Sequence, residues 1–312
     1  MHTEKEITRI ASLLPSATEL VCALGLQDRL VGVTHECDYP PEVACLPRLT
    51  ERLLPQSDPK SLDSLVTQAV HTHRSLYHLD IDALERLDVD LILTQELCDV
   101  CAVAYDEVVA AARLLHAPTT VVSLEPQTLE QVFEQLDLIG RLCGVEDWAK
   151  ALHAKLRQRV AAYAEQSSAL AHPSVYVMEW LDPPWAAGHW VPEMVAAAGG
   201  QEVLGKAGLP SRRIDWEELF AANPQYIVFA PCGYDLAGIV EEVQRVAFPK
   251  RWSMLRAVRE EHLYAVQASA YFSRPGSRVV DGIATLAEIL HPEVFGTDRQ
   301  GQDWVPVTFR CA

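Results

Sequence analysis

Short apolar runs alternate with segments of helical spacing in both halves of the chain. The runs predict strands at residues 9–14, 30–33, 90–94, 119–124, 174–178, 226–229 and 262–266. Helical spacing predicts helices at residues 16–24, 80–87, 101–115, 192–198, 236–246 and 278–290. The first helix opens with Ser16 and Glu19 at the spacing of a capping box. Strands that alternate with helices of this length predict parallel sheets and therefore an α/β fold.

The middle of the chain breaks this alternation. Residues 128–142 and 145–168 both carry helical spacing, and no strand pattern separates them. At 1.5 Å per residue, the second stretch would be about 36 Å long. We therefore predict two Rossmann-like α/β lobes, residues 1–142 and 171–312, joined by a backbone helix within residues 143–170. The stretch after Phe295 is polar and is predicted to be loop.

Length and composition agree with two packed lobes. The 312 residues are about twice a typical single domain, and 49% of them are hydrophobic. A formal charge of −17 argues against a nucleic-acid or anionic membrane surface. No apolar run reaches the roughly 18 residues that span a bilayer, and the first residues lack the basic and apolar regions of a secretory signal. The sequence as it stands predicts a cytoplasmic protein with reduced thiols.

Chemically distinctive side chains concentrate after the predicted strands. In open α/β sheets, ligands bind beyond the carboxyl ends of the strands. Four aromatic residues follow strand ends in the second half, where their flat rings could grip a large planar ligand: Trp185, Trp190, Tyr234 and Tyr271. The polar candidates for ligand binding are Glu179, His189, Arg274 and His35. The alternative is that the rings cover a small core and that the polar side chains are structural.

Four of the eight cysteines lie in the same predicted loops. Cys37, Cys98, Cys101 and Cys232 would together supply four thiolates, which suit zinc or an iron–sulfur cluster. Cys98 and Cys101 form a Cys-x-x-Cys pair, whose turn can bring two thiolates onto one ion. The same pair could serve as a redox dithiol, and free cysteines are also common as small, half-buried loop residues. All three interpretations stay open.

No arrangement of residues in the sequence indicates catalysis. The segment from Gly200 to Lys206 nearly matches a phosphate-binding P-loop, but Ala207 stands where Ser or Thr would bind magnesium. The segment also follows a predicted helix rather than a strand. Nucleophile-elbow and His-Glu-x-x-His motifs are absent from the sequence. Whether the protein is an enzyme stays open, and binding is the favoured interpretation.

Several segments resemble a known family. The opening Arg9-Ile-Ala-Ser-Leu-Leu-Pro-Ser-Ala-Thr-Glu19 is similar to the start of cobalamin-binding members of the helical-backbone (class III) substrate-binding proteins of ABC importers. Residues 24–33 and 84–93 resemble the segments that follow in those members. The resemblance is closest to a branch, usually labelled cobalamin-binding, that carries His-Glu-Cys-Asp-Tyr-Pro, Leu-Cys-x-Val-Cys-Ala-Val and Gly-His-Trp-Val-Pro. These motifs stand here at residues 35–40, 97–103 and 188–192.

The resemblance implies a non-enzymatic protein that binds cobalamin or a related metal chelate in a cleft between its lobes. Trp185, Trp190 and Tyr271 would be the contact rings. An ABC importer would be the partner if the chain is exported. Two alternatives remain. The protein could be a cytoplasmic carrier of a cysteine-ligated metal or iron–sulfur cluster in the same cleft, or an enzyme on the same scaffold.

Overall fold

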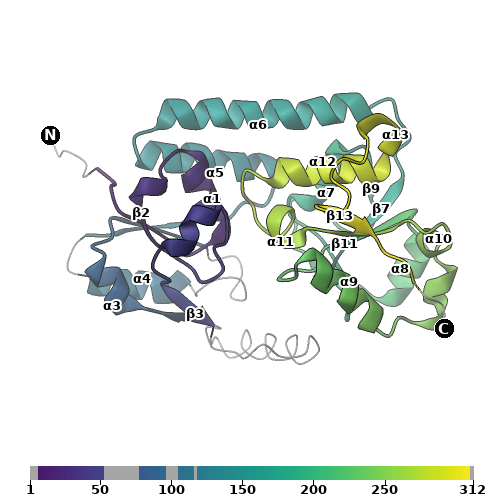
Figure 1. The fold of residues 1–312 in the computed structure, drawn as a ribbon, viewed down its shortest axis with the longest axis horizontal. Coiled ribbons are helices and arrows are strands. Elements are labelled where there is room, and N and C mark those ends of the chain that lie inside the picture. Colours follow the sequence, from purple (N-terminus) through teal and green to yellow (C-terminus); the bar gives the residue numbers. More distant parts are fainter. Residues whose placement is uncertain (1–5, 53–76, 96–104, 116–117, 310–312) are drawn as a thin grey trace. The chain divides into compact units, whose positions relative to one another are not determined.

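A computed structural model gives the structure of the protein and describes residues 6–52, 77–95, 105–115 and 118–309 (Figure 1). The chain divides into two compact units. Unit 1 comprises Met1–Glu125 and Glu134–His153, and unit 2 comprises Pro126–Phe133 and Ala154–Ala312. Each unit contains its own β-sheet with helices packed on it. The α/β fold with two lobes that the sequence predicts is confirmed.

The central sheet of unit 1 has four parallel strands. They are β1 (Ile10–Ser12), β2 (Leu30–Val33), β5 (Leu91–Thr94) and β6 (Thr120–Ser123), in the order β2-β1-β5-β6. Each lies within an apolar run of the first half, which confirms these four predicted strands. β1 and β5 are buried along their whole length, as expected for the central strands of a parallel sheet whose two faces are covered.

Helices and a small second sheet complete unit 1. The helices are α1 (Pro15–Ala23), α3 (Ile81–Arg86), α4 (Tyr105–Leu114) and most of α5 (Leu129–Leu142), with short 3-10 turns η1 (Gln27–Arg29) and η2 (Pro41–Cys45). The second sheet pairs β3 (Thr50–Arg52) with β4 (Tyr77–Leu79) in antiparallel fashion. One face of the central sheet packs on α3 and α4. Ala11 and Ile92 share a buried cluster there with Leu84 of α3 and Val108 of α4.

The start of α1 differs from the prediction. The helix begins at Pro15, and Leu14 precedes it without a side-chain cap, so the predicted capping box at Ser16 and Glu19 was wrong. Proline suits the first helical position because its φ is already helical and its missing N–H would have no partner there. The Thr18 hydroxyl instead donates to the Ser12 side chain at 2.8 Å and ties α1 to β1.

The sheet of unit 2 has seven strands. They are β7 (Ser174–Trp180), β8 (Trp185–Ala186), β9 (Gln201–Glu202), β10 (Arg212–Arg213), β11 (Tyr226–Phe229), β12 (Leu263–Val266) and β13 (Trp304–Pro306). The order is β10-β8-β7-β11-β12-β13, and β9 also pairs with β7. β7, β9, β11 and β12 are parallel, whereas β8, β10 and β13 run antiparallel to their neighbours.

The strand β13 lies in the polar tail that the sequence predicts to be loop, so that prediction was wrong. Trp304 pairs with Val266 of β12, and its indole N–H donates to the Glu288 carboxylate at 3.0 Å. Only 5% of Trp304 is exposed. Three residues are too few to show a strand period, and the partner strand lies far back in the sequence.

Helices cover both faces of the unit 2 sheet. They are α7 (Val191–Ala197), α8 (Trp216–Ala222), α9 (Leu236–Arg245), α10 (Arg256–Arg259), α11 (Ala268–Tyr271), α12 (Val279–Leu290) and α13 (Pro292–Phe295), with the 3-10 turn η3 (Lys250–Met254). In Figure 1, α7 and α12 lie on one side of the strands and α9 lies on the other. α12 is buried over nearly its whole length, which makes it the central helix of this unit.

The longest helix is α6 (Glu146–Ser167), whose 22 residues span about 33 Å. It confirms the long helix predicted at residues 145–168. Its first residues belong to unit 1 and its residues from Ala154 onward belong to unit 2. No helix among the described residues combines the length and the apolar character needed to cross a membrane.

Candidate ligand-binding site

The carboxyl ends of β7 and β11 bring aromatic side chains together in unit 2. Trp180 ends β7, and its ring centroid lies 6.1 Å from that of Tyr234, which follows β11. Trp185 begins β8 and pairs with Trp180 across the two strands. After β12, Ser269 donates a hydrogen bond to the Tyr234 carbonyl at 3.2 Å. We call the half-buried rings of Trp180, Trp185 and Tyr234 the aromatic edge, since they lie where α/β sheets bind ligands.

Trp180 is a candidate that the sequence did not single out. The apolar pattern ended the strand at Met178, so Trp180 counted as part of a long loop. The pairing of β7 with β8 shifts register between Met178 and Trp180, and this irregularity hides the strand's last residues from a simple alternation. The preference of tryptophan for strands is the signal that could have extended β7.

The loop after β8 holds Trp190 inward. Its indole N–H donates to the Phe272 carbonyl at 3.0 Å, and only 9% of the residue is exposed. The ring of His189 stacks on Trp190 with centroids 5.6 Å apart, and His189 has a left-handed backbone (φ +51°). A Cβ at Gly188 would collide with the Leu209 carbonyl oxygen, so this close approach of two chain segments requires glycine. Trp190 therefore anchors the segment that carries His189.

Two polar atoms of this region are buried without a hydrogen-bond partner among the described residues. They are Oε2 of Glu179 and Nε2 of His189. Burial raises the pKa of Glu179, and a hydrogen bond from Ser211 opposes that rise. The Ser211 hydroxyl also accepts from the Gly188 amide at 3.0 Å. Burial lowers the pKa of His189. Both shifts favour the uncharged side chain, so Glu179 and His189 form what we call the neutral pair.

Tyr271 and Arg274 follow β12. Tyr271 ends the short helix α11, and its hydroxyl donates to Asp303 Oδ1 at 3.0 Å. Burial and this hydrogen bond raise the pKa of Tyr271 to about 12. Arg274 is half-buried in the turn that follows, where its carbonyl accepts from the Gly276 amide at 2.9 Å. Tyr271 is thus a phenol whose proton is already engaged.

His35 and Cys37 lie after β2 in unit 1. His35 Nδ1 lies 2.8 Å from the Thr50 hydroxyl, and its ring centroid lies 5.3 Å from that of Tyr77. Cys37 is only 2% exposed, and its sulfur lies 3.0 Å from the Thr18 hydroxyl. These contacts fix both side chains within unit 1.

The proposed metal ligands do not form a recognisable site in the described part of the chain. Cys232 is exposed in unit 2, whereas Cys37 is buried in unit 1. Cys98 and Cys101 lie outside the described residues. Among the residues that are described, no group of three or more His, Cys, Asp or Glu side chains could hold a metal ion. The structure gives no support to zinc or an iron–sulfur cluster.

The glycine-rich segment from Gly200 to Lys206 contains its own hydrogen-bond acceptor, Glu202. The Glu202 carboxylate accepts hydrogen bonds from the amides of Val177, Leu204 and Gly205, at 2.9 to 3.0 Å. Burial raises the pKa of Glu202 to about 7, although these amides oppose that rise. The amides that a P-loop would offer to phosphate are therefore already engaged, in agreement with the rejection of a P-loop.

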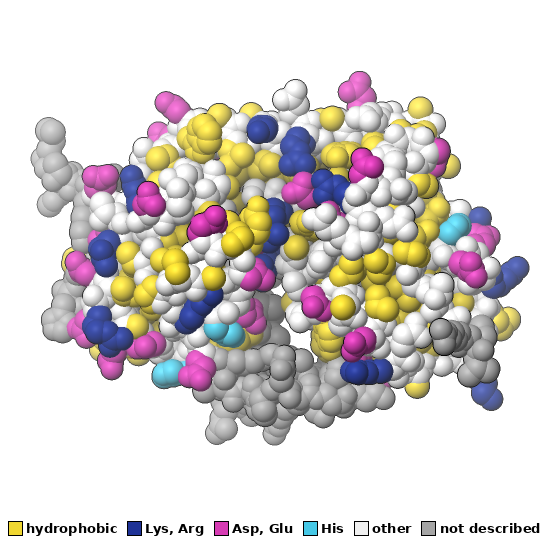
Figure 2. All heavy atoms as spheres, in the orientation of Figure 1, with side chains coloured by type: hydrophobic (Ala, Val, Ile, Leu, Met, Phe, Trp, Pro, Cys, Tyr) yellow, Lys and Arg dark blue, Asp and Glu magenta, His cyan; other side chains and the backbone are white. Residues whose placement is uncertain are grey.

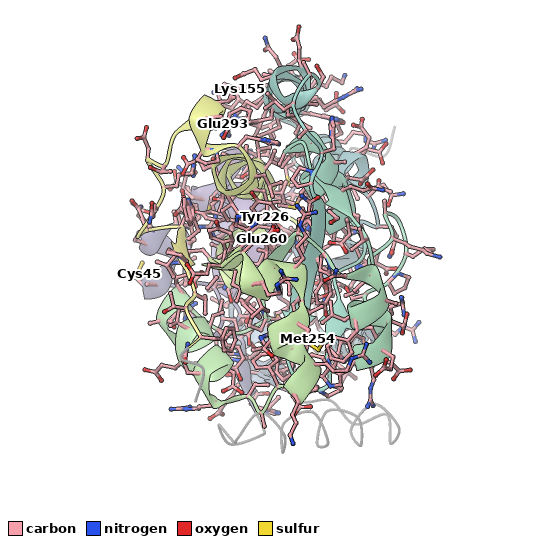
Figure 3. All side chains as sticks on the ribbon, turned by 90° about the vertical axis from the view of Figure 1, so that its right-hand side faces the viewer. Cys45, Lys155, Tyr226, Met254, Glu260 and Glu293 are labelled. Atoms are coloured by element: carbon pink, nitrogen blue, oxygen red, sulfur yellow. The ribbon has the colours of Figure 1, made fainter. Side chains whose placement is uncertain are left out.

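Aromatic rings also lie at the opposite end of the unit 2 sheet, where its parallel strands begin. Tyr226 begins β11 and stacks on His262, with centroids 4.4 Å apart and an interplanar angle of 9°. Tyr264 lies 6.1 Å from Tyr226. Figure 3 shows Glu260 beside Tyr226, and His262 Nδ1 lies 3.7 Å from that carboxylate. We call Tyr226, His262 and Tyr264 the amino-end stack.

Charged side chains of both signs are interspersed on the face of the molecule drawn in Figure 2. Several are paired within unit 2, such as Arg251 with Glu217 at 2.6 Å and Arg212 with Glu218 at 2.8 Å. On the face drawn, basic side chains therefore lie among acidic ones.

Comparison with known proteins decides the family. The sequence profile of the family described as periplasmic binding protein matches residues 98–270, more than half of the chain. The chain belongs to the periplasmic binding protein family. The family resemblance that the sequence motifs carry is thereby confirmed.

Relatives of this periplasmic binding protein are similar over nearly its whole length. It is 24% identical over 306 residues to YvrC, an uncharacterized ABC transporter substrate-binding lipoprotein of Bacillus subtilis, covering 94% of this chain and 82% of the relative. It is 24% identical over 287 residues to a vitamin B12-binding protein of Vibrio cholerae, covering 90% and 88%. A periplasmic heme-binding protein of Pseudomonas aeruginosa has the same fold, with a TM-score of 0.71, 19% identity and coverage of 98% and 100%.

These relatives bear on two expectations from the sequence. One of them is named as a lipoprotein and another as a periplasmic protein, so the expectation of a cytoplasmic protein finds no support. None of the three is named as an iron–sulfur or zinc protein, which agrees with the lack of a metal cluster among the described residues of this periplasmic binding protein.

Proposed function

We propose that this periplasmic binding protein captures a corrinoid, of which cobalamin is the example, and presents it to an ABC importer. Relatives named as a vitamin B12-binding protein and as an ABC transporter substrate-binding lipoprotein support the class of cargo and the partner. The same comparison supports function outside the cytoplasm.

The observation that carries the proposal is the aromatic edge. Trp180, Trp185 and Tyr234 are half-buried at the carboxyl ends of β7 and β11. Flat rings bury a large apolar area at a small cost in side-chain entropy and suit the faces and edges of a macrocycle. Tyr271 follows the next strand and would add a fourth ring. Trp190, whose indole is bonded to the Phe272 carbonyl, would support this platform from behind.

The neutral pair distinguishes corrinoids from haem. A corrinoid carries carboxamide side chains, whereas haem carries propionate carboxylates. A protonated Glu179 can donate to an amide oxygen, and a neutral His189 can accept from an amide nitrogen or donate to an amide oxygen, depending on its tautomer. A carboxylate would instead bring a charge to two buried groups that supply no compensating charge. Arg274 is the remaining polar candidate in unit 2 for contact with the cargo.

The alternative of a cysteine-ligated cluster has no such observation behind it. Cys37 is engaged with Thr18, and the described residues hold no cluster of metal-binding side chains. We therefore propose no metal centre. The metal of the cargo would come bound to its own macrocycle.

Matched ligands test the proposal. Purified protein is titrated with cyanocobalamin, with cobinamide, and with cobyrinic acid, which has the same macrocycle with carboxylates in place of amides. We expect cyanocobalamin and cobinamide to remain bound through gel filtration, and cobyrinic acid to bind at least about tenfold more weakly. Failure to bind either amide ligand contradicts the corrinoid proposal. Tight haemin binding without corrinoid binding would replace it with a porphyrin.

A further inference from the structure

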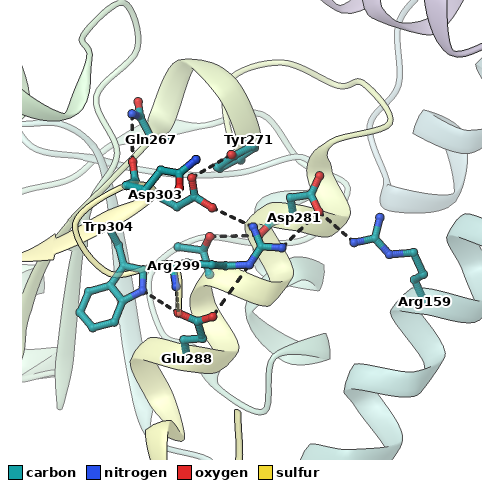
Figure 4. A network of polar contacts seen from close by, with 10 residues as sticks. Arg159, Gln267, Tyr271, Asp281, Glu288, Arg299, Asp303 and Trp304 are labelled. Atoms are coloured by element: carbon teal, nitrogen blue, oxygen red, sulfur yellow. Dashed lines mark hydrogen bonds and ion pairs between the residues drawn. The ribbon is translucent and has the colours of Figure 1, made fainter. Parts of the chain in front are cut away.

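A network of polar contacts lies behind Tyr271 (Figure 4). Asp303 accepts from the Tyr271 hydroxyl with one carboxylate oxygen at 3.0 Å and from Arg299 with the other at 2.7 Å. Asp303 is only 5% exposed. Because both of its oxygens are engaged, Asp303 links the aromatic ring to the guanidinium.

Arg299 is itself held from several directions. Its guanidinium lies 3.5 Å from Asp281 and 3.9 Å from Glu288 of α12, and its backbone amide donates to Glu288 at 3.0 Å. Glu288 also receives the indole N–H of Trp304. Asp281 in turn pairs with Arg159 of α6 at 2.8 Å. The network therefore connects Tyr271 to two helices and to β13.

Without this network Tyr271 would have little to fix it. It ends a helix of only four residues, so its ring does not lie along a long regular element. Its backbone packs against α12 at Gly282, where a Cβ would lie 3.0 Å from the Tyr271 Cβ and 3.2 Å from its carbonyl oxygen. The Arg278 guanidinium lies 5.7 Å from the ring centroid. The hydrogen bond to Asp303 is the contact that fixes the phenol end of the side chain.

We propose that Asp303, held by Arg299, is a positioning residue that fixes the ring of Tyr271 in the orientation in which it contacts the cargo. The inference rests on the proposed function, because it assigns Tyr271 to the binding site. Asp303 and Arg299 would never touch the cargo. They would act by holding one ring ready before binding, which reduces the ordering that binding requires.

The same geometry assigns Tyr271 the role of a neutral ring rather than a metal ligand. Its proton lies between the phenol oxygen and a carboxylate, and removing it would place two negative oxygens side by side. The raised pKa of Tyr271 agrees with this. A phenolate that bonds the metal of a chelate, as tyrosine does in some haem proteins, is therefore disfavoured here.

A double-mutant cycle tests the proposal, with cobinamide affinity as the readout. Tyr271→Phe and Asp303→Asn are each expected to weaken binding about three- to tenfold. The double variant is expected to bind no more weakly than the single variant that binds more weakly. Glu288→Gln is the matched control, because it neutralises a buried carboxylate of the same core while Arg299 keeps its contacts with Asp303 and Asp281. It should lower the melting temperature but leave affinity within about twofold. If Asp303→Asn does not fold, Arg299→Lys takes its place in the cycle, because it changes the side chain that holds Asp303 and keeps a cation there.

A second readout reports on Tyr271 without any ligand. The pH titration of its ring carbon signal, assigned by comparison with Tyr271→Phe, should shift to lower pH in Asp303→Asn, because a negative neighbour has been removed. The positioning role is overturned if Asp303→Asn weakens binding equally in the Tyr271→Phe background, or if the titration does not move. If the wild-type protein binds no corrinoid while the titration does move, the hydrogen bond stands and the proposed function has failed.

Discussion

The two ends of the unit 2 sheet both carry aromatic rings, but the polar atoms beside the rings differ. At the amino end, Tyr226 stacks with both His262 and Tyr264, and His262 has the Gln225 carbonyl at 3.2 Å. At the carboxyl end, the aromatic edge lies beside two buried polar atoms that lack partners among the described residues. A group of aromatic rings is therefore not by itself the mark of a binding site. Unmatched polar atoms beside the rings distinguish the two ends, since burying such atoms is costly unless a ligand pairs with them.

The largest expected effect tests the rings themselves. Replacing Trp180 and Trp185 together with alanine should weaken cobinamide binding by about 2 to 3 kcal/mol, or about 100-fold, because two large contact surfaces are lost. The matched control replaces Tyr226 and Tyr264 of the amino-end stack, and it should leave affinity within about twofold. Calorimetric titration measures both variants. Similar losses of affinity in the two double variants would contradict the distinction between the two ends.

A smaller effect tests the neutral pair. Cobinamide affinity should fall about tenfold as pH rises through the raised pKa of Glu179, because the ionised carboxylate can no longer donate to an amide. The folded state holds this proton to higher pH than the unfolded chain does, so the same ionisation also lowers the free energy of unfolding as pH rises.

Glu179→Gln is uncharged at every pH and should remove this slope of affinity. Glu260→Gln, at the amino end, is the matched control and should retain it. Affinity is measured across the pH range for the wild type and for both variants. The role of the neutral pair is contradicted if the affinity of Glu179→Gln changes with pH as much as that of the wild type.

The smallest effect concerns stability alone. His262→Ala removes the closest ring of the amino-end stack and should cost about 1 kcal/mol in the free energy of unfolding, with no change in affinity. Urea denaturation with and without cobinamide measures both quantities. Tyr234→Ala at the carboxyl end should do the reverse and lose affinity with less change in stability. A stability loss confined to Tyr234→Ala would reverse the assignment of the two ends.

Much of the fold could be predicted because its signals are local. β1, β5, β7, β11 and the helix α6 follow directly from apolar runs and helical spacing. β13 could not be predicted, because Trp304 becomes part of a strand only by pairing with Val266 and by bonding Glu288. The start of α1 was misplaced for a local reason, since Pro15 outweighed the capping residues that follow it.

The candidate site was only partly open to prediction. Its general position follows from the alternation of elements, which predicts that Trp185, Tyr234 and Tyr271 come after strands at one end of the sheet. What each side chain does there depends on distant residues. Trp190 bonds a carbonyl 82 residues away, and Tyr271 bonds a carboxylate 32 residues away. No pattern within a short window contains such contacts.

The ion pair between Arg159 of α6 and Asp281 of α12 has a consequence for how the chain can change in length. Each residue of an α-helix turns the chain by about 100° and advances it by about 1.5 Å. Tyr163 of the same helix is a second anchor, because its ring centroid lies 5.7 Å from that of Phe295. One residue inserted or deleted between Arg159 and Tyr163 would therefore rotate one of these two side chains away from its partner. Insertions should be accommodated in exposed loops such as residues 168–172, which follow the helix. In this part of α6, the chain should accept a change of residue more readily than a change of length.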